Sequence, residues 1–202
     1  MSRFLLAAFL ATLTGCSSYR GTAQTFEGDD LAAQGWIAVR DVRLVAQEES
    51  NDCGSAALAM VLGYWGHEAD ARSISEACHL EPGTGISAGA LREVARAHGL
   101  RAYVLASFLP DLVRELSRGR PVVVGLVKPV AAGALAHFEV VVGIHPEKLL
   151  VATLDPGHGY RSNSFDGFLA EWRSAGFVTL VVFPPAQKPA APVPALALGE
   201  KQ

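Results

Sequence analysis

Two short valine-rich runs, residues 122–127 and 140–144, constrain the fold of this chain more than any other feature. They are the longest apolar runs after residue 15, and their length is typical of buried strands, because a membrane helix needs about 20 residues. The helices expected from periodicity and turn residues cover 55–65, 69–78, 87–98, 110–118 and 166–174, and the expected strands cover 101–106, 121–127, 138–145, 149–154 and 177–183. Because helices come first and strands follow, we expect an α+β fold with an antiparallel sheet.

Composition sets the broad class of the protein. The 202 residues are 50% hydrophobic and 18% charged, which excludes a chain that is disordered throughout and fits one domain with appendages. The net charge of −3 gives no electrostatic footprint for nucleic acid, so no such partner is expected. Three cysteines are too few for a scaffold built on disulfides.

The first sixteen residues have the features of an export signal. Arg3 supplies a positive charge, and residues 4–13 form an uncharged apolar stretch too short to span a bilayer. The next motif, Leu13-Thr14-Gly15-Cys16, resembles the bacterial lipobox, whose cysteine is lipidated and becomes the mature N-terminus. We expect a lipoprotein signal peptide over residues 1–15 and a lipid anchor on Cys16. The alternative is an ordinary signal peptide followed by an unmodified cysteine.

The resemblance to lipoproteins also predicts a location. Many Gram-negative lipoproteins retained at the inner membrane carry Asp after the cysteine, whereas this chain has Ser17. We therefore expect a protein of the bacterial cell envelope, anchored by lipid on the periplasmic face and more readily at the outer membrane than at the inner one.

Local composition divides the remaining chain into three parts. Residues 16–35 are mostly polar with no apolar period, so we expect a tether. Residues 185–202 are dominated by Pro and Ala, so we expect a disordered tail. The expected folded domain is therefore residues 36–184, a common domain size.

Cys53 is the first candidate for chemistry. It lies at the expected start of the first helix, where the positive end of the helix dipole stabilises a thiolate, the nucleophilic form of cysteine. A cysteine before a helix is more often structural than catalytic, so this position alone does not assign a role.

A histidine and an aspartate complete the candidate site. His137 opens the expected strand 138–145, and Asp155 ends the next expected strand. If those strands pair as a hairpin, their outer ends meet and His137 lies beside Asp155. A nucleophile, a base and an orienting acid are the parts that cysteine-based catalysis requires.

Motifs along most of the chain resemble the peptidase C39 family of bacteriocin-processing, double-glycine leader peptidases. The pattern Gln-x-x-x-x-Asp-Cys-Gly is present at residues 47–54, and Tyr64-Trp65-Gly66 ends the helix that follows. Arg120-Pro121 before a valine strand, His137-Phe138 and Asp155-Pro156 extend the resemblance, which spans about residues 42–181. The resemblance implies a papain-like cysteine protease fold with N-terminal helices packed on the sheet.

The resemblance also implies residue roles. Cys53 would be the nucleophile, His137 the general base, Asp155 the residue that orients the imidazole, and Gln47 a donor to the oxyanion hole. The implied function is a cysteine endopeptidase that cleaves exported peptides or proteins after a double-glycine-type site. A secretion system is a further candidate partner.

Some residues stay open at this point. Glu139 stands where the family usually has a hydrophobic residue; it shares a face with His137 by period two, and it either contacts substrate or points to solvent. Gly54 is a second tentative substrate-binding residue, because a glycine lets another group approach closely. Cys78 is expected to be a free thiol, since a Cys53–Cys78 disulfide would abolish the nucleophile. The histidines show no metal-ligand spacing, so neither metal nor cofactor is expected.

Two other functions use the same sequence features. A C39-like domain can serve as a non-catalytic peptide-binding module that assists a secretion system. A papain-like site can also catalyse other acyl transfers, such as amidase chemistry, because the nucleophile is shared.

Overall fold

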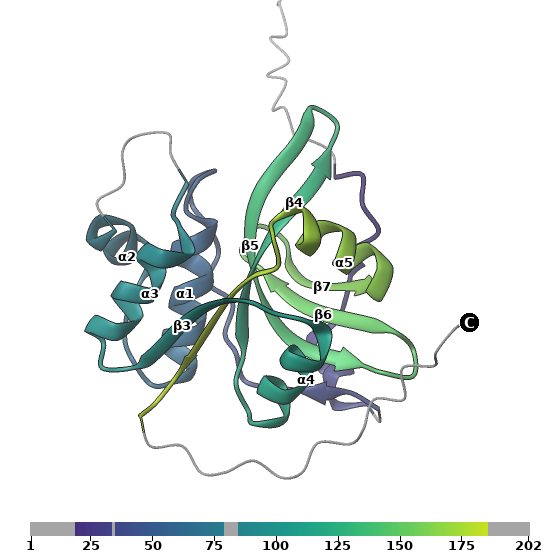
Figure 1. Cartoon of the computed structure of the whole chain (residues 1–202), viewed down its shortest axis with the longest axis horizontal. Helices are drawn as coiled ribbons and strands as arrows, with labels where there is room; N and C mark the ends of the chain where they lie inside the picture. Colours follow the sequence, from purple (N-terminus) through teal and green to yellow (C-terminus); the bar gives the residue numbers. More distant parts are fainter. Residues whose placement is uncertain (1–18, 34, 79–84, 186–202) are drawn as a thin grey trace, which may run out of the picture.

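The computed structural model describes residues 19–33, 35–78 and 85–185. Its helices are α1 (Cys53–Tyr64), α2 (Ala71–Ala77), α3 (Ala88–Ala97), α4 (Leu109–Ser117) and α5 (Phe165–Ser174), with a 3-10 helix η1 (Gly28–Ala32). Its strands are β1 (Gln24–Thr25), β2 (Ile37–Ala38), β3 (Arg101–Ala106), β4 (Val122–Val130), β5 (Gly133–His145), β6 (Leu150–Asp155), β7 (Gly159–Ser164) and β8 (Val178–Phe183). Figure 1 shows α1, α2 and α3 grouped on one side of the molecule and most of the sheet on the other.

The strands form one sheet in which every pairing is antiparallel. Seven strands follow the order β1-β7-β6-β5-β4-β8-β3, and β2 also pairs with β5. With the helices α1 to α3 preceding the main strands, this architecture confirms the expected α+β fold.

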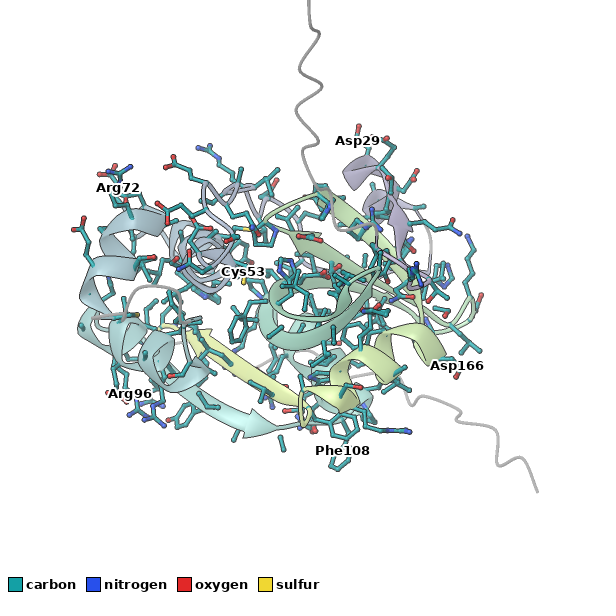
Figure 2. All side chains as sticks on the ribbon, turned by 90° about the horizontal axis from the view of Figure 1, so that it is seen from above. Asp29, Cys53, Arg72, Arg96, Phe108 and Asp166 are labelled. Carbon is teal, nitrogen blue, oxygen red and sulfur yellow. The ribbon has the colours of Figure 1, made fainter. Side chains whose placement is uncertain are left out.

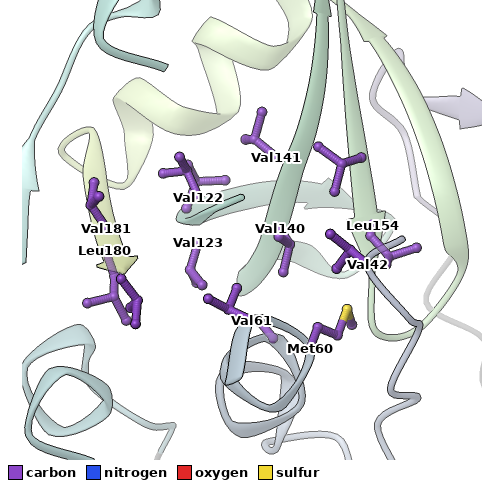
Figure 3. Packing of buried hydrophobic residues seen from close by; sticks show 14 of the residues in the cluster. Val42, Met60, Val61, Val122, Val123, Val140, Val141, Leu154, Leu180 and Val181 are labelled. Carbon is purple, nitrogen blue, oxygen red and sulfur yellow. The ribbon is translucent and has the colours of Figure 1, made fainter. Parts of the chain in front are cut away.

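Helix α1 lies at the centre of the hydrophobic core. Its residues 56–62 are at most 2% exposed, so it is apolar on all sides rather than amphipathic. Such a helix must be covered all round, and α2, α3, β4 and β5 pack around it. Figure 3 shows Val61 of α1 directed at Val123 of β4 and Val140 of β5. This packing fixes the start of α1, and with it Cys53, against the sheet.

Strand β5 of the long β4–β5 hairpin starts earlier than the expected strand 138–145. It begins at Gly133, which pairs directly with Val130. Small residues such as Ala134 and Ala136 carry little strand signal, and cross-strand pairing with β4 sets their conformation. Residues 133–136, which lie between the two expected strands, are therefore strand.

The N-terminal segment also differs from expectation. Residues 19–33 were expected within a tether, yet β1 pairs with β7 and Leu31 of η1 is only 2% exposed. The polar composition of this segment concealed it, because part of its attachment is backbone pairing with β7 and with Val130 of β4. The folded unit thus begins before residue 36. Strand β7 was also missed, since its sequence Gly-Tyr-Arg-Ser-Asn-Ser lacks an apolar alternation.

The described residues cover the expected end of the folded domain but little of the expected terminal segments. Strand β8 ends at Phe183, close to the expected domain end at residue 184. The signal peptide, Cys16 and most of the tail lie outside the described residues. Among the described helices, none combines the length and the apolar character needed to cross a bilayer.

Candidate active site

Cys53 is the first residue of α1, and it is 8% exposed. The loop before it is closed by Asp52, whose Oδ2 accepts hydrogen bonds from the backbone N–H groups of Glu48 (3.0 Å) and Glu49 (3.2 Å). Asp52 is the N-cap residue of α1, and the first turn of the helix contains no acidic side chain. Figure 2 shows Cys53 between α1 and the strands of the sheet.

Gly54 serves the packing of α1 in this position. A Cβ atom at Gly54 would lie 3.1 Å from the ring of Phe138 and 3.3 Å from Leu91. The space beside Gly54 is therefore filled by the protein itself. Its missing side chain lets α1 approach β5 closely, and through this approach it sets the position of Cys53.

His137 and Asp155 lie together as the hairpin argument predicts. Strands β5 and β6 are paired with Val140 opposite Leu154, and this register brings the two polar residues side by side. The distance from His137 Nε2 to Asp155 Oδ1 is 2.8 Å. The side chain of Cys53 also interacts with the His137 imidazole and helps to raise its pKa. Because Asp155 engages Nε2, Nδ1 is the ring nitrogen available to the thiol.

The electrostatics of this pair favour ionisation of both partners. Burial disfavours the charged form of His137, but the hydrogen bonds to Asp155 and Cys53 and the negative charges of Asp155 and Glu139 outweigh it and raise the pKa of His137. Burial likewise opposes the charged form of Asp155, but the hydrogen bond to His137 and its positive charge hold the pKa of Asp155 well below its ordinary value. The pair is therefore an imidazolium–carboxylate ion pair at neutral pH.

Asp155 has two further partners that the sequence did not indicate. Its Oδ1 accepts a hydrogen bond from the Gly157 backbone N–H at 2.8 Å, and its Oδ2 lies 3.0 Å from His158 Nδ1. The side chain of His158 is 63% exposed, whereas His137 is buried. A histidine in a turn gives no periodic signal, so only the Asp-Pro-Gly-His spacing, which returns the chain toward the carboxylate, could have identified it.

Gln47 lies next to the Asp155–Gly157 turn. Its backbone N–H donates to the Pro156 carbonyl at 3.0 Å, and its side-chain Nε2 donates to the Glu49 carbonyl at 3.1 Å. Its Oε1 would lie 3.4 Å from a Cβ atom on Gly157. Within the described part of the chain, no hydrogen bond joins Gln47 to Cys53. The side chain is thus held beside the turn that carries the Asp155 carboxylate.

Glu139 is neither exposed to solvent nor available to a substrate. It is 1% exposed, and its Oε1 lies 2.5 Å from the ammonium of Lys128, which is also buried. Lys128 makes a second ion pair of 2.9 Å with Glu171 of α5. Because side chains alternate along a strand, Glu139 does lie on the same face as His137. The buried ammonium of Lys128 on β4 explains why a charged residue is tolerated there. Both expectations for Glu139 are therefore wrong.

Potential metal ligands among the described residues gather at one place. One ligand atom from each of His137, Glu139 and Asp155 lies within 4.8 Å of the other two. The cluster is already balanced by cations of the protein, because Lys128 pairs with Glu139 and the His137 imidazolium pairs with Asp155. Ion pairing therefore explains why these three side chains lie so close together.

The two described cysteines are not joined. Cys53 and Cys78 are both free thiols. Cys78 is half-buried at the end of α2, and burial raises the pKa of its thiol. A disulfide between them is thus absent. Cys53 remains the thiol next to the histidine and carboxylate, and a thiol and an imidazole linked in this way can form a thiolate–imidazolium pair suited to covalent acyl transfer.

Comparison with known proteins agrees with the resemblance seen in the sequence. The profile of the peptidase C39 family matches residues 41–186, most of the chain. None of the curated proteins compared with the chain matches it.

Several solved structures share the fold. The peptidase domain of Streptococcus ComA, a bifunctional ABC transporter involved in quorum sensing, is 22% identical with a TM-score of 0.59, covering 71% of this chain and 99% of that domain. A C39-like peptidase from Bacillus anthracis is 16% identical with a TM-score of 0.60, covering 76% of this chain and 99% of that one. A double-glycine-motif protease from an AMS/PCAT transporter, solved with its leader peptide, is 21% identical with a TM-score of 0.57, covering 73% and 94%.

At these identities the solved structures establish the fold, and the expected papain-like arrangement of helices against an antiparallel sheet is confirmed. The family match covers well over half of the residues and includes all of the candidate site. The chain belongs to the peptidase C39 family.

Proposed function

We propose that the protein is a cysteine endopeptidase whose catalytic residues are Cys53, His137 and Asp155. One observation carries the proposal: a cysteine at a helix start interacts with a buried histidine, and this histidine is hydrogen-bonded to a buried carboxylate. This order supplies a nucleophile, an acid–base group and a residue that fixes the tautomer of the imidazole.

The proposed reaction proceeds through a thioester. In the reactive form Cys53 is a thiolate facing the imidazolium of His137, and the sulfur attacks the carbonyl carbon of the scissile peptide bond. The tetrahedral oxyanion is held by the Cys53 backbone N–H and by the side-chain amide of Gln47, which leaves the Glu49 carbonyl to donate to it. The backbone N–H of Gln47 stays bonded to the Pro156 carbonyl and keeps this residue near the site. His137 then protonates the leaving amine, the C–N bond breaks, and the acyl group stays on sulfur.

Hydrolysis of the thioester completes the cycle. His137 takes a proton from a water molecule that attacks the acyl carbon, and the sulfur leaves as thiolate. The released product carries a new carboxylate, and the Cys53 thiolate again faces the imidazolium of His137. Asp155 remains ionised throughout and stabilises that imidazolium.

The proposed substrate is an exported peptide or protein with a double-glycine-type site. Family membership supports this, as does the leader peptide bound by the double-glycine-motif protease of similar fold. Narrow subsites that reject side chains would explain the preference, because a closed pocket excludes bulk, whereas an open one discriminates by only about 1–3 kcal/mol per methylene.

A peptide series tests the proposed function directly. Peptides that differ only in the two residues before the cleaved bond should be cut when both are Gly, cut more slowly with Ala in the position next to the bond, and left intact with Leu in either position. Product masses identify the cleaved bond. Efficient cleavage of a peptide with Leu or Phe in the second position would contradict a double-glycine specificity.

We further propose that the protein is lipid-anchored at Cys16 on the periplasmic face of the cell envelope. The apolar stretch and lipobox-like motif before Cys16 support this. Such a location would place the enzyme beside exported clients, with a secretion system as a candidate partner. Mass spectrometry of the mature N-terminus should find an acylated Cys16, and a mature chain that begins at another residue would contradict the anchor.

A further inference from the structure

The tip of the β4–β5 hairpin is an exposed apolar surface. We define the tip as residues 129–136, Pro-Val-Ala-Ala-Gly-Ala-Leu-Ala, which contains no charged or polar side chain. Every residue from 131 to 136 is exposed, and Leu135 retains 42% of its surface. A contiguous exposed apolar segment on an otherwise mixed surface is typical of a contact site for a partner or a membrane.

The hairpin extends beyond the rest of the sheet. Strand β4 pairs with β8 only at residues 122–124, and β5 pairs with β6 only from Val140 onward. Between these limits the two strands pair with each other out to the pair Val130 and Gly133, and the one further partner among the described residues is the segment at Tyr19, which bridges to Val130. Figure 1 shows the hairpin projecting from the body of the molecule. The tip can therefore insert into a surface, such as a membrane, while the rest of the domain stays outside it.

The described chain begins beside this tip. Tyr19 forms a β-bridge with Val130, and the Arg20 backbone N–H donates to the Pro129 carbonyl at 2.8 Å. The Tyr19 hydroxyl donates to Glu171 at 2.5 Å, which fixes the position of this residue on the domain. The N-terminal part of the chain thus joins the fold at the base of the tip.

The covalent distance from this point to Cys16 is short. Tyr19 follows Cys16 by three residues, so even a fully extended chain spans at most about 11 Å between them. A lipid on Cys16 would hold Tyr19, and with it Val130, close to the bilayer surface. An apolar tip held there would meet the boundary between headgroups and acyl chains, where apolar side chains are stabilised by burial.

We propose that the β4–β5 tip is a membrane-docking element that inserts shallowly into the lipid surface beside the acylated Cys16. The inference rests on the lipid attachment proposed above, and it goes further by fixing the orientation of the enzyme on the membrane. Insertion is shallow because the outer edges of a two-stranded hairpin carry unpaired backbone N–H and C=O groups. Hydrocarbon offers these groups no hydrogen-bond partners. Leu135 lies two residues before His137 on β5, so this orientation holds the site near the bilayer.

Tryptophan placed on the tip tests the proposal. The lipid-bearing protein with Leu135→Trp is reconstituted into phosphatidylcholine/phosphatidylglycerol vesicles with and without brominated lipid. After subtraction of the parent emission, the added tryptophan should be blue-shifted and quenched by bromine. Leu105→Trp is the matched control, because Leu105 is a similarly exposed leucine on β3, and its added emission should be neither shifted nor quenched.

A charge on the tip provides the second arm. Ala132→Glu combined with Leu135→Trp should abolish the blue shift and the quenching, since the carboxylate resists transfer into lipid. Cleavage of a soluble double-glycine peptide in the absence of vesicles should stay the same in Ala132→Glu as in the parent. That second readout separates failure of the docking proposal from failure of the proposed peptidase activity.

Three results would overturn the proposal. One is a protein that floats with vesicles while tryptophan at 135 stays unquenched, which leaves the lipid anchor intact but removes docking. Another is a protein that does not float at all, which removes both. The third is loss of peptide cleavage in Ala132→Glu with quenching unchanged, which would assign the tip to the substrate instead of the membrane.

Discussion

At the scale of single residues, Asp155 organises the candidate site. Its two oxygens accept hydrogen bonds from the Gly157 backbone and His137 on one side and contact His158 on the other. A carboxylate with this many partners is fixed in orientation, and it fixes the imidazole of His137 in turn. The pKa of the imidazole is raised as a result, and that of Asp155 is lowered.

The pair predicts a pH dependence of stability. The raised pKa of His137 contributes stability that is fully present below about pH 6.5, its ordinary value, and is lost as the pH rises above it. The lowered pKa of Asp155 contributes stability that is present above about pH 3.8 and is lost as the pH falls. Urea unfolding should therefore show the largest difference between the parent and His137→Ala at pH 4–6.5. A difference that grows steadily above pH 7 would contradict the ion pair.

Gln47 carries a kinetic prediction at the same scale. If its amide helps to hold the oxyanion, Gln47→Ala should lower kcat about 10²–10³-fold with little change in KM. Glu48→Ala is the matched control, because its side chain is 77% exposed and the change should leave kcat unaltered. Turnover of Gln47→Ala at the parental rate would remove Gln47 from the site.

At the scale of elements, a buried ion network joins the β4–β5 hairpin to α5. Lys128 on β4 lies between Glu139 on β5 and Glu171 on α5, and all three are at most 9% exposed. The two carboxylates hold the pKa of Lys128 above its ordinary value despite the opposing effect of burial. Glu171 also accepts the hydrogen bond of Tyr19, so the network ties the N-terminal segment to the strand that carries His137.

Removing the cation should unfold much of this arrangement. Lys128→Met leaves two buried carboxylates without a partner, and breaking a buried ion pair in this way lowers the free energy of unfolding by about 3–5 kcal/mol. The triple variant Lys128→Met, Glu139→Gln, Glu171→Gln removes the charges together and should recover most of that loss. Urea unfolding measures both. Equal stability of Lys128→Met and the parent would show that the network does not contribute.

Local patterns in the sequence identified some parts of the site better than others. The Cys53 helix and the His137–Asp155 pair could be predicted, because a helix start and a tight hairpin connection between residues 145 and 150 fix geometry over short distances. The Lys128–Glu139 pair depends on register across a hairpin, and the contact with Glu171 depends on where α5 packs. Those placements are set by tertiary packing. Residues 19–33 were missed because their sequence has no apolar period, although backbone pairing and the burial of Leu31 attach them to the sheet.

At the scale of the whole molecule, the N-terminal segment acts as part of the domain. It crosses from the β4–β5 tip, where Tyr19 pairs with Val130, to β7, where Gln24 pairs with Ser162. It then buries Leu31 against the sheet at Gly143, where a Cβ atom would lie 2.8 Å from the leucine side chain. The described N-terminal segment, residues 19–33, is thus an integral part of the fold.

Truncation measures the contribution of this segment. A chain that begins at residue 36 should be less stable than one that begins at residue 19 by at least about 3 kcal/mol, from burial of Leu31 and the lost hydrogen bonds. Thermal and urea unfolding of the two chains provide the comparison. If both unfold at the same temperature and urea concentration, the segment is a tether after all.

The central claim is that Cys53 forms a covalent acyl-enzyme, and trapping that species tests it most directly. The protein is mixed with a double-glycine peptide, quenched in acid within the first turnover, and analysed by intact-mass and fragment mass spectrometry. The account predicts an added mass equal to the N-terminal product less one water, located on Cys53, in the parent and in Cys78→Ala but not in Cys53→Ala. Cleavage that persists in Cys53→Ala, an adduct on another residue, or peptide binding with neither adduct nor cleavage would contradict it.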